Sequence, residues 1–485
     1  MVRVRYAPSP TGTLHIGGAR TALFNYLFAR HHHGRFILRV EDTDRARLVP
    51  GSEEGMIRGL RSLGITWNEG PDVGGDYGPY RVSERIHRHK EAVKQLLDQG
   101  SAYRCYCTTE ELENEKKRLE SLKLPPRYSG KCRLRPPDDP IFQSDKPFVV
   151  RMKVPTEGET VVDDLIRGRV VFENRILDDF VIQKSDGNPV YNFAVVLDDH
   201  DMAITHVIRG EEHLSNTPKQ ILIYRALSLP VPEFAHLPMI LAPDRTKVSK
   251  RHGATSVEEY RAQGILPEAL VNYLLLLGWS APDETEMMTL DQAAEWFDLA
   301  RVQHTAAIYD YKKLVWMNSQ YMRTMSVETL IEYALPFVEA RHLDLSHGPD
   351  LARTVELVRE RAHTLQDLTE ALAFFYERPK TFDSQGMAKH FALDATPARL
   401  RVLADRLSQL RTWDHDHLAR VYDEEAQRQG IKRAALIHPT RLAVTGKTVG
   451  PGLFELLEVL GQEETVARLY DVATAIEEER LTPTP

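Results

Sequence analysis

Cysteine is scarce in this sequence, which has three cysteines, Cys105, Cys107 and Cys132, among 485 residues. An odd number cannot pair completely, so the disulfide framework of a small secreted protein is excluded. Long apolar runs are also missing, because the most apolar stretch, residues 270–279, is far too short to span a bilayer. The first six residues, Met-Val-Arg-Val-Arg-Tyr, do not contain the apolar stretch of a signal peptide. We therefore expect a cytoplasmic protein without a membrane anchor.

An excess of positive charge is missing too. The chain has 62 basic and 70 acidic side chains, for a formal net charge of −8. Whole-chain charge thus does not indicate a nucleic-acid partner, although a local basic face could still bind one. The composition, 42% hydrophobic and 27% charged, is that of an ordinary globular protein. At about 100–200 residues per domain, the length indicates three or four domains.

The first 40 residues have the pattern of an α/β domain. Apolar and charged side chains alternate over residues 2–6, which predicts a strand, and residues 7–12 form a turn cluster rich in proline and glycine. Apolar residues then recur at helical spacing over 14–30, and residues 36–40 predict a second strand. The order strand, helix, strand favours a parallel sheet with right-handed crossovers.

Residues 80–186 differ in character from their surroundings. They contain all three cysteines, a lysine- and glutamate-rich helical pattern at 110–123 and a proline-rich stretch at 136–147. We interpret this segment as an insertion. After it, strand-like and loop signals return at 190–196 and 205–208.

The second half of the chain is predicted to be helical. From about residue 256 onward, amphipathic helical patterns predominate, for example at 354–372 and 399–410. The sequence has neither a fixed-period repeat nor a low-complexity segment beyond its Thr-Pro tail. The fold class expected is therefore α/β followed by all-α.

Two short segments could carry phosphate chemistry. The small residues of 8–18 allow close backbone approach to a ligand, and His15 stands at a helix N-terminus, where negative charge is favoured. Residues 244–251 have four basic side chains in eight positions, and such a loop can close over phosphates as a cationic clamp. Taken alone, each segment has an ordinary interpretation, a loop or a solvated basic turn.

Together, the two segments resemble a pair of known signatures. His15-Ile16-Gly17-Gly18 and Lys247-Val248-Ser249-Lys250-Arg251 are similar to the HIGH and KMSKS motifs of class I aminoacyl-tRNA synthetases, with Gly18 and Val248 as the departures. Longer blocks resemble the glutamyl branch of that class, the bacterial-type glutamyl-tRNA synthetases. These blocks are residues 5–18, 36–47, 69–79, 184–199 and 207–218, with weaker similarity as far as 451–454.

The resemblance implies a particular architecture. A Rossmann-like catalytic domain with a doubly wound parallel sheet would hold an inserted α+β domain for the tRNA acceptor stem, and an all-helical anticodon-binding half would follow. The protein would be a monomer. The domains expected are 1–80 with 187–254 (catalytic), 81–186 (inserted), 255–325 (helical, stem contact) and 326–485 (anticodon-binding, with a subdomain boundary near 395).

The reaction implied is the ATP-dependent attachment of L-glutamate to tRNA-Glu. Glutamate would attack the α-phosphate of ATP, and tRNA would then take the glutamyl group from the adenylate, with release of pyrophosphate and AMP. Mg²⁺ is expected with the ATP. The resemblance assigns charge stabilisation to His15, Lys247 and Lys250, and ATP binding to these three with Gly17, Gly18, Glu212, His213 and Ser249.

Glutamate carries two carboxylates and one ammonium, so its pocket needs two separated cations and one anion. Arginine binds a carboxylate better than lysine does, because its fork is bidentate. By the resemblance, Arg5 and Arg209 are the cations, Glu41 and Ser9 face the ammonium, and Tyr191 donates a hydroxyl.

Five further residues match positions that contact tRNA in the family. Thr43, Asp44 and Arg47 correspond to positions at the acceptor end, and Arg361 and Arg441 to positions that read the anticodon. Because Arg361 matches the position that tests the third anticodon letter, we expect a discriminating enzyme that charges tRNA-Glu but not tRNA-Gln.

The cysteines resemble a zinc site that some members of the family have. Cys105-x-Cys107 followed after 24 residues by Cys132 fits that spacing, and the fourth ligand would stand two residues later, where this chain has Leu134. Structural zinc requires four ligands, and leucine cannot be one. We therefore do not expect bound zinc, unless Tyr128 or water completes the set.

Four alternatives have distinguishing features. A glutaminyl-tRNA synthetase would have C-terminal β-barrels, and a glutamyl-queuosine tRNA-Asp synthetase would be shorter and lack the anticodon region. A small-molecule nucleotidyltransferase would not need the long helical half. A non-catalytic tRNA-binding module should have lost His15 or the lysines of 247–251, and all are present.

Overall fold

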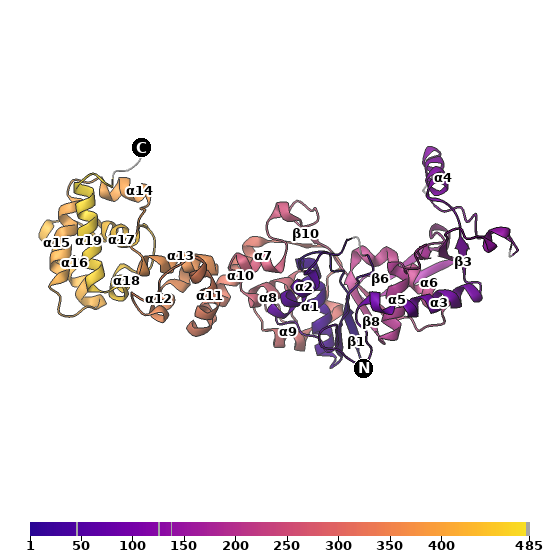
Figure 1. Ribbon diagram of the computed structural model, residues 1–485. Helices are drawn as coiled ribbons and strands as arrows, with labels where there is room; N and C mark the ends of the chain where they lie inside the picture. Colours follow the sequence, from indigo (N-terminus) through magenta and orange to yellow (C-terminus); the bar gives the residue numbers. More distant parts are fainter. Residues whose placement is uncertain (45–46, 125–126, 137, 482–485) are drawn as a thin grey trace. The chain divides into compact units, whose positions relative to one another are not determined.

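The computed structural model describes residues 1–44, 47–124, 127–136 and 138–481 (Figure 1). These residues form two compact units. Unit 1 consists of residues 1–260 and 270–310, and unit 2 of residues 261–269 and 311–485. Of the helices described, none is both long and apolar enough to cross a lipid bilayer.

The sheets of unit 1 contain both parallel and antiparallel pairs. Strand β1 (Arg3–Tyr6) pairs in parallel with β2 (Arg35–Leu38). A four-stranded sheet has the order β6-β5-β9-β8, in which β8–β9 and β5–β9 are parallel and β5–β6 is antiparallel. The doubly wound arrangement is therefore mixed rather than wholly parallel. The strands of this sheet are β5 (Glu159–Asp164), β6 (Gly168–Glu173), β8 (His206–Gly210) and β9 (Glu233–Leu237).

Helix α1 (Ile16–His31) begins directly after the turn that follows β1, as the sequence predicted. Ten of its sixteen residues are buried, including Leu23 and Phe24, so it is a core helix rather than a surface one. The other helices of unit 1 are α2 (Ser52–Ser62), α3 (Ile86–Asp98), α4 (Thr109–Ser121), α5 (Tyr191–Asp201), α6 (Thr217–Ala226), α8 (Pro267–Leu276, which begins in unit 2) and α9 (Leu290–Trp296), and α7 (Val257–Ala262) ends in unit 2.

The strand-like interpretation of residues 190–196 is wrong, because Tyr191 to Asp201 form helix α5. The run Phe193–Leu197 is buried on every side, so it lacks the polar face that reveals a helical period. A short, continuous apolar run cannot be assigned to helix or strand by periodicity alone.

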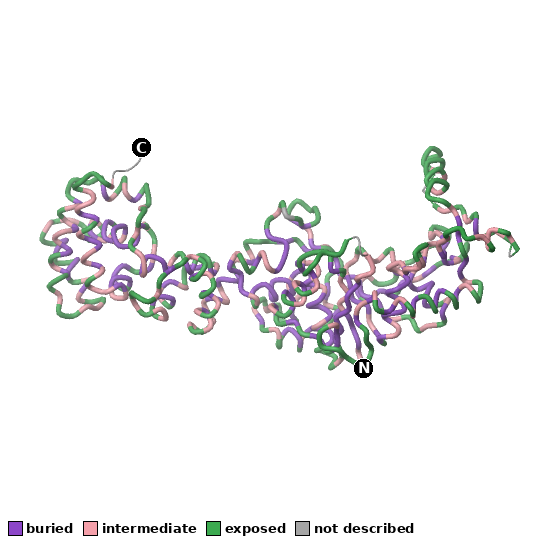
Figure 2. Tube along the Cα trace, in the orientation of Figure 1, coloured by how far each residue is buried: buried purple, intermediate pink, exposed green. Residues whose placement is uncertain are grey.

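The insertion contains a small antiparallel sheet of order β3-β4-β7 and the predicted charged helix. Its strands are β3 (Ala102–Cys105), β4 (Val149–Met152) and β7 (Val181–Gln183). Helix α4 starts with a capping box between Thr108 and Glu111. All residues of α4 are described and none is buried, so the helix is mostly green in Figure 2, with three residues of intermediate exposure. Unit 1 also has a two-residue pair, β10 (Ile240–Leu241) with β11 (Ala307–Ile308).

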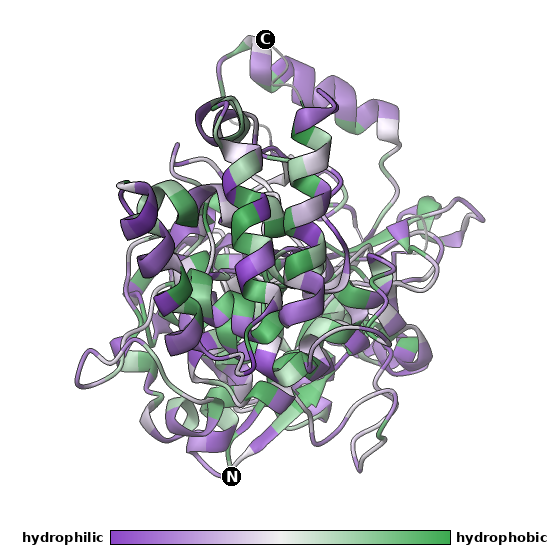
Figure 3. Cartoon of the chain, turned by 90° about the vertical axis from the view of Figure 1, so that its left-hand side faces the viewer, coloured by the Kyte–Doolittle hydropathy of each residue, from purple (hydrophilic) through white to green (hydrophobic). Residues whose placement is uncertain are grey.

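Unit 2 confirms the prediction of a helical C-terminal half, since its described residues form helices and loops. Its helices carry both hydrophobic and hydrophilic residues (Figure 3), and their apolar side chains share one core that includes Leu368, Leu403 and Leu456. The helices are α10 (Tyr311–Thr324), α11 (Val327–Ala340), α12 (Leu351–Val358), α13 (Leu365–Tyr376), α14 (Ser384–Gly386), α15 (Thr396–Ser408), α16 (His415–Gln429), α17 (Ala434–Thr445), α18 (Leu453–Leu460) and α19 (Gln462–Glu477).

One predicted helix of unit 2 is divided. The pattern at 354–372 spans the end of α12, a 3₁₀ turn at Arg359–Arg361 and the start of α13. Thr364 forms a capping box with Asp367, which starts a new helix within the apolar pattern. The buried residues of α12 and α13 follow one apolar period. This period continues across the 3₁₀ turn between the two helices, so the sequence pattern did not show the break.

Candidate active site

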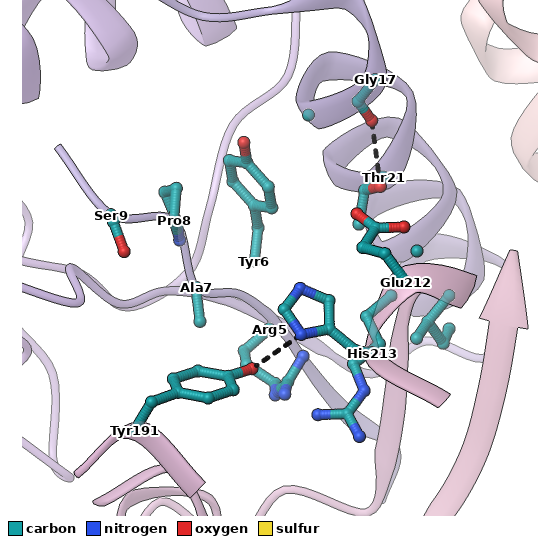
Figure 4. A pocket seen from close by; sticks show the side chains of 14 residues that line it. Arg5, Tyr6, Ala7, Pro8, Ser9, Gly17, Thr21, Tyr191, Glu212 and His213 are labelled. Carbon is teal, nitrogen blue, oxygen red and sulfur yellow. Dashed lines mark hydrogen bonds between the residues drawn. The ribbon is translucent and has the colours of Figure 1, made fainter. Parts of the chain in front are cut away.

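A cavity of about 250 Å³ lies beside the C-terminal ends of β1 and β8 and the N-terminal ends of α1 and α5 (Figure 4). Ligands of open α/β sheets bind at this kind of edge, where strands end and helices begin. The cavity brings together eight of the predicted site residues for the amino acid and ATP with six residues that were not singled out. It is lined by Arg5, Tyr6, Ala7, Pro8, Ser9, Gly17, Gly18, Thr21, Tyr191, Ile208, Arg209, Gly210, Glu212 and His213.

Arg5, at the end of β1, is 3% exposed and is held by a carboxylate. Its Nε and Nη2 donate to the two oxygens of Asp199 at 2.9 and 3.2 Å. Asp199, on α5, also accepts from Nη1 of Arg39 at 2.8 Å. Burial alone would raise the pKa of Asp199, but the guanidinium groups of Arg5 and Arg39 bring that pKa below its usual value. Asp199 therefore stays ionised and fixes the orientation of Arg5.

Arg209, at the end of β8, is 5% exposed and has an unused donor. Its Nε donates to Nε2 of His236 at 3.2 Å, and its Nη2 donates to Thr217 at 2.7 Å and Gln220 at 2.9 Å. Its Nη1 is buried without a hydrogen-bond partner among the residues that the structure describes. Burial lowers the pKa of this guanidinium, and the nearby charge of Arg5 acts in the same direction. A buried, uncompensated cation is costly, so this position favours an anionic ligand.

Tyr191 and His213 face each other across the cavity. The Tyr191 hydroxyl and Nδ1 of His213 are 3.5 Å apart, as the dashed line in Figure 4 shows. Burial, together with the charge of Arg209, lowers the pKa of His213 to about 4. The imidazole is thus neutral at physiological pH and adds no positive charge.

The two residues predicted to face the ammonium differ in their placement. Ser9 lines the cavity, whereas Glu41 is not among the described residues that line it. Glu41 is buried directly after β2, and its Oε1 accepts from Nε and Nη2 of Arg39 at 3.1 and 3.0 Å. Burial raises the pKa of Glu41, which the charge of Arg39 offsets in part.

A second cavity, of about 280 Å³, adjoins the first. The two share Gly17, Gly18, Thr21, Gly210 and Glu212, so ligands in them would meet at this common wall. The second cavity is further lined by His15, Arg20, Pro238, Met239, Ile240, Lys247 and Val248.

His15 is the N-cap of α1, and this role determines which of its ring nitrogens carries the proton. Its Nδ1 accepts a hydrogen bond from the backbone N of Gly17 at 3.1 Å. Burial, followed by the charge of Lys247, lowers the pKa of His15. The ring is therefore neutral, with its proton on Nε2, and it can donate from that atom into the second cavity.

Gly18 departs from the HIGH pattern for a steric reason. A Cβ at this position would lie 2.4 Å from the Tyr6 hydroxyl oxygen, whereas a Cβ at Gly17 would meet His15 Nδ1 at an ordinary 3.5 Å. Tyr6 is fixed in β1 and lines the first cavity. The fourth motif position in this chain is therefore restricted to glycine.

Gly18→Ala is expected to lower kcat/KM for ATP by about tenfold, because the new methyl group displaces Tyr6, which lines the first cavity, and so disturbs the common wall at Gly18. Steady-state aminoacylation kinetics measure the effect. Gly17→Ala is the matched control and should cost less than about threefold. Tyr6→Phe in the Gly18→Ala background should restore activity, since it removes the clashing oxygen; a double variant no better than Gly18→Ala would contradict this explanation.

The structure describes the basic loop, residues 244–251, except for one side chain. Lys247 lines the second cavity, and the backbone N of Ser249 donates to Nδ1 of His252 at 3.2 Å. Arg251 and Asp244, at the two ends of the loop, form an exposed ion pair of 3.5 Å. The side chain of Lys250 is outside the described residues.

The residues predicted to meet tRNA fall into two places. In unit 1, Asp44 and Arg47 form an exposed ion pair of 2.6 Å close to Thr43 in the chain, and residues 45 and 46 between them are not described. In unit 2, Arg361 ends the 3₁₀ turn after α12, and Arg441, on α17, donates from Nη1 to the carbonyl of Pro451 at 2.6 Å. Burial lowers the pKa of Arg441, and the charge of Arg361 acts in the same direction.

The three cysteines converge in the insertion. Their sulfur atoms lie within 4.8 Å of one another, although 24 residues separate Cys107 from Cys132 in the sequence. The Tyr128 hydroxyl lies 3.4 Å from Cys105 Sγ, while Leu134 is 82% exposed and has no ligand atom. The donor set brought together is thus three sulfurs and one phenol oxygen.

Three residues that support the site were not singled out from the sequence: Asp199, His236 and Asp164. Asp199 ends the block at 184–199 that resembles the family, and its place in this block is the signal that could have pointed to it. His236 and Asp164 lie on β9 and β5, at strand positions that carry no local signal.

Comparison with known proteins is consistent with this geometry. Residues 1–316 match the family described as "tRNA synthetases class I (E and Q), catalytic domain", and residues 329–473 match an "Anticodon binding domain". The chain therefore belongs to the class I aminoacyl-tRNA synthetases.

Its relatives are more specific. It is 48% identical over 484 residues to "Glutamate–tRNA ligase" of Moorella thermoacetica, covering 98% of this chain and 99% of the relative. It is 50% identical over 471 residues to "Glutamate–tRNA ligase 1" of Syntrophomonas wolfei, covering 96% and 95%. A crystal structure of a glutamate tRNA ligase from Elizabethkingia meningosepticum, in complex with its amino acid, superimposes with a TM-score of 0.90 at 35% identity, covering 98% and 99%. Within its class, the chain belongs to the bacterial glutamate–tRNA ligase family.

Proposed function

We propose that this chain attaches L-glutamate to tRNA-Glu, with glutamate in the first cavity and ATP in the second. The observation that carries the proposal is the pair of cavities with a common wall at Gly17, Gly18, Thr21, Gly210 and Glu212. One cavity holds a buried arginine that favours an anion, and the other holds a histidine donor and a lysine. Two ligands meeting at one wall are arranged for reaction between them.

The first cavity recognises glutamate through its arginines. The α-carboxylate must lie toward the common wall, because it reacts with ATP there. Arg209, with its free Nη1, is then available to the side-chain carboxylate, and Arg5 provides the second cation. Tyr191 adds a hydroxyl donor. Ser9 faces the ammonium from the cavity wall. Glu41, which is not among the described residues of that wall, would have to approach the ammonium with its second oxygen, since Oε1 is used by Arg39.

The first chemical step joins glutamate to AMP. A carboxylate oxygen attacks the α-phosphorus of ATP, the bond to the bridging oxygen breaks, and pyrophosphate leaves. His15 donates from Nε2, and Lys247 and Lys250 add positive charge, so that these three residues stabilise the charge on the phosphates. The nucleotide is also held by Gly17, Gly18, Ser249 and His213. Mg²⁺ would neutralise phosphate charge when bound, and Glu212 offers it a carboxylate.

The second step transfers the glutamyl group. The terminal adenosine hydroxyl of tRNA attacks the adenylate carbonyl, loses its proton, and AMP leaves. Thr43, Asp44 and Arg47 place the acceptor end, and Arg361 and Arg441 read the anticodon. We propose the domains accordingly: residues 1–80 with 187–254 catalytic, 81–186 at the acceptor stem, 255–325 at the tRNA stem and 326–485 at the anticodon.

ATP–pyrophosphate exchange tests the proposal. Glutamate should support exchange in the presence of tRNA-Glu and give little exchange without it. Exchange supported by glutamine would favour a glutaminyl enzyme. Charging of tRNA-Asp would favour the queuosine-modifying type, and tRNA-independent exchange with another acid would favour a small-molecule nucleotidyltransferase. The absence of exchange under every condition would leave only a non-catalytic tRNA-binding module.

Arg361→Gln is expected to relax anticodon selection. The wild-type chain should charge tRNA-Glu and not tRNA-Gln, because an exposed guanidinium forms good hydrogen bonds with only one of the two bases at the third anticodon position. In the variant, kcat/KM for tRNA-Gln should rise by about tenfold. Arg353→Gln, an exposed arginine on α12, is the matched control. Efficient charging of tRNA-Gln by the wild-type protein would refute the role of Arg361.

Metal analysis of the purified protein is expected to find less than one equivalent of zinc. Leu134 cannot ligate, and the alternative fourth donor is the Tyr128 phenol, whose pKa is raised by burial and by its hydrogen bond with Cys105. A phenol that keeps its proton is a poor zinc ligand. Full occupancy, lost in Tyr128→Phe, would show that the phenol completes the site after all.

A further inference from the structure

Behind Arg209 lies a line of buried polar groups that the proposed chemistry does not use. Arg209 on β8 and His236 on β9 are register partners, and Nε of Arg209 is 3.2 Å from Nε2 of His236. On the other side of the imidazole, Nδ1 of His236 is 2.6 Å from Oδ2 of Asp164, at the end of β5. The side chains of His236 and Asp164 are both 0% exposed.

The hydrogen bonds define the tautomer of His236. A carboxylate oxygen only accepts, so the His236 proton is on Nδ1 and is donated to Asp164. The lone pair on Nε2 then accepts from Arg209 Nε–H and from the Thr217 hydroxyl, whose oxygen is 3.0 Å away and itself accepts from Arg209 Nη2. Burial lowers the pKa of His236, with the charge of Arg209 acting in the same direction and Asp164 opposing it. The ring is therefore a neutral acceptor.

This arrangement determines which donor of Arg209 remains for a ligand. Nε is used by His236, and Nη2 is used by Thr217 and Gln220. Gln220 is held in turn, because its Nε2 donates to Asn192 at 2.9 Å and so its oxygen faces Arg209. Nη1 is left without a partner among the described residues, on a side chain that lines the amino-acid cavity.

We propose that His236 is a positioning residue for amino-acid recognition: its Nδ1–H tautomer, selected by Asp164, holds Arg209 so that Nη1 faces the carboxylate of the substrate. The proposal rests on the assignment of Arg209 to glutamate made above. The opposite tautomer would place an N–H of His236 against the N–H of Arg209, and the guanidinium would have to turn away.

Asp164 allows an isosteric test of this role. Its Oδ1 accepts from the backbone N of Ile166 at 3.0 Å, of Arg167 at 2.8 Å and of His236 at 3.3 Å. In Asp164→Asn the amide oxygen should therefore stay at those three donors, which places the NH₂ group against Nδ1 of His236. The imidazole must then take the Nε2–H tautomer, without a change of shape.

Glutamate-dependent aminoacylation of Asp164→Asn is the experiment, with ¹⁵N NMR of the histidines as a second readout. We expect KM for glutamate to rise by about ten- to a hundredfold, because a hydrogen bond to a charged group is lost. KM for ATP should change by less than about threefold, since the second cavity does not contain Arg209. The NMR signals of His236 should show the proton on Nε2. Asp163→Asn, the exposed neighbour on the same strand, is the matched control.

A second pair of variants covers the case in which Asp164→Asn does not fold. His236→Gln keeps an acceptor near the position of Nε2 and should hold KM for glutamate within about threefold, whereas His236→Leu removes the acceptor and should raise it at least tenfold. In the His236→Gln background, Asp164→Asn should have little further effect, because the tautomer is gone.

The inference is overturned if KM for glutamate in Asp164→Asn and His236→Leu stays within the range of Asp163→Asn, or if the His236 proton remains on Nδ1. The assignment of Arg209 is tested separately by Arg209→Met. If that variant raises KM for glutamate and the other two do not, only the role of His236 fails. If Arg209→Met also leaves KM unchanged, the proposed glutamate site itself fails.

Discussion

Replacing Arg209 by methionine is expected to lower kcat/KM for glutamate by about 100- to 1,000-fold, since removing one partner of a buried charge pair costs about 3–5 kcal/mol. Methionine keeps much of the side-chain volume and removes the charge. The loss should fall mainly on KM, because the contact is made to a carboxylate that does not react. The buried guanidinium has three neutral partners and one free donor, so its contribution is realised only when an anion binds.

Aminoacylation at varied glutamate concentration measures this effect, and ATP–pyrophosphate exchange at saturating glutamate separates binding from chemistry. Arg225→Met, an exposed arginine at the end of α6, is the control and should remain close to wild type. KM for ATP should hardly change, because Arg209 does not line the second cavity in the part of the chain that is described. A loss smaller than about threefold would show that Arg209 is structural.

Replacing His15 by asparagine is expected to lower kcat by about 100- to 1,000-fold, the usual effect of removing one donor from a developing negative charge. Two roles of His15 are combined in one ring that lines the second cavity: Nδ1 caps α1 through Gly17, and Nε2–H is left as a donor for a ligand. Asparagine is a good N-cap, so it should keep the helix start and lose the donor. His15→Ala loses both and should also unfold at a lower temperature, by about 1 kcal/mol of stability.

Single-turnover adenylate formation, measured beside thermal unfolding, distinguishes the two roles. His15→Asn should have a slow chemical step, a wild-type melting temperature and an unchanged KM for glutamate. A variant with wild-type turnover would restrict His15 to helix capping. If the variant is slow only because it is unfolded, its melting temperature will be lowered, while its rate at low temperature will equal that of the wild type. This result too would contradict a role in charge stabilisation.

The sequence predicted the parts of the fold that have a strong local period or a strong local stop. Helix α1 follows a proline- and glycine-rich turn and ends before Gly34, and α4 starts at a capping box. The prediction from sequence failed where complete burial removed the helical period of apolar residues, as in α5. It also failed where a helix cap interrupted a continuous apolar stripe, as at Thr364. In both places the deciding information is a tertiary contact or a single side chain, which a window average does not detect.

The candidate site divides in the same way. Arg5, His15 and Arg209 lie in sequence segments that resemble the family, and they were predicted from that resemblance. The structure places them at adjoining cavities. The groups that hold them come from distant positions: Asp199 from α5, His236 from β9, which pairs with β8, and Asp164 from β5, on the far side of β9. Aspartate and histidine at such positions carry no spacing signal, because their partners are 27 to 194 residues away in the chain.

The central claim is that the first cavity selects a ligand with a side-chain carboxylate. The direct test is the ratio of kcat/KM for glutamate and glutamine in aminoacylation of tRNA-Glu. The two amino acids have nearly the same shape, and each offers an oxygen to the free donor of Arg209, but only glutamate neutralises the charge of this guanidinium. We predict a preference for glutamate of at least about 1,000-fold, as expected when a buried charge would otherwise be left without a partner of opposite sign. Comparable values for the two amino acids would contradict the account.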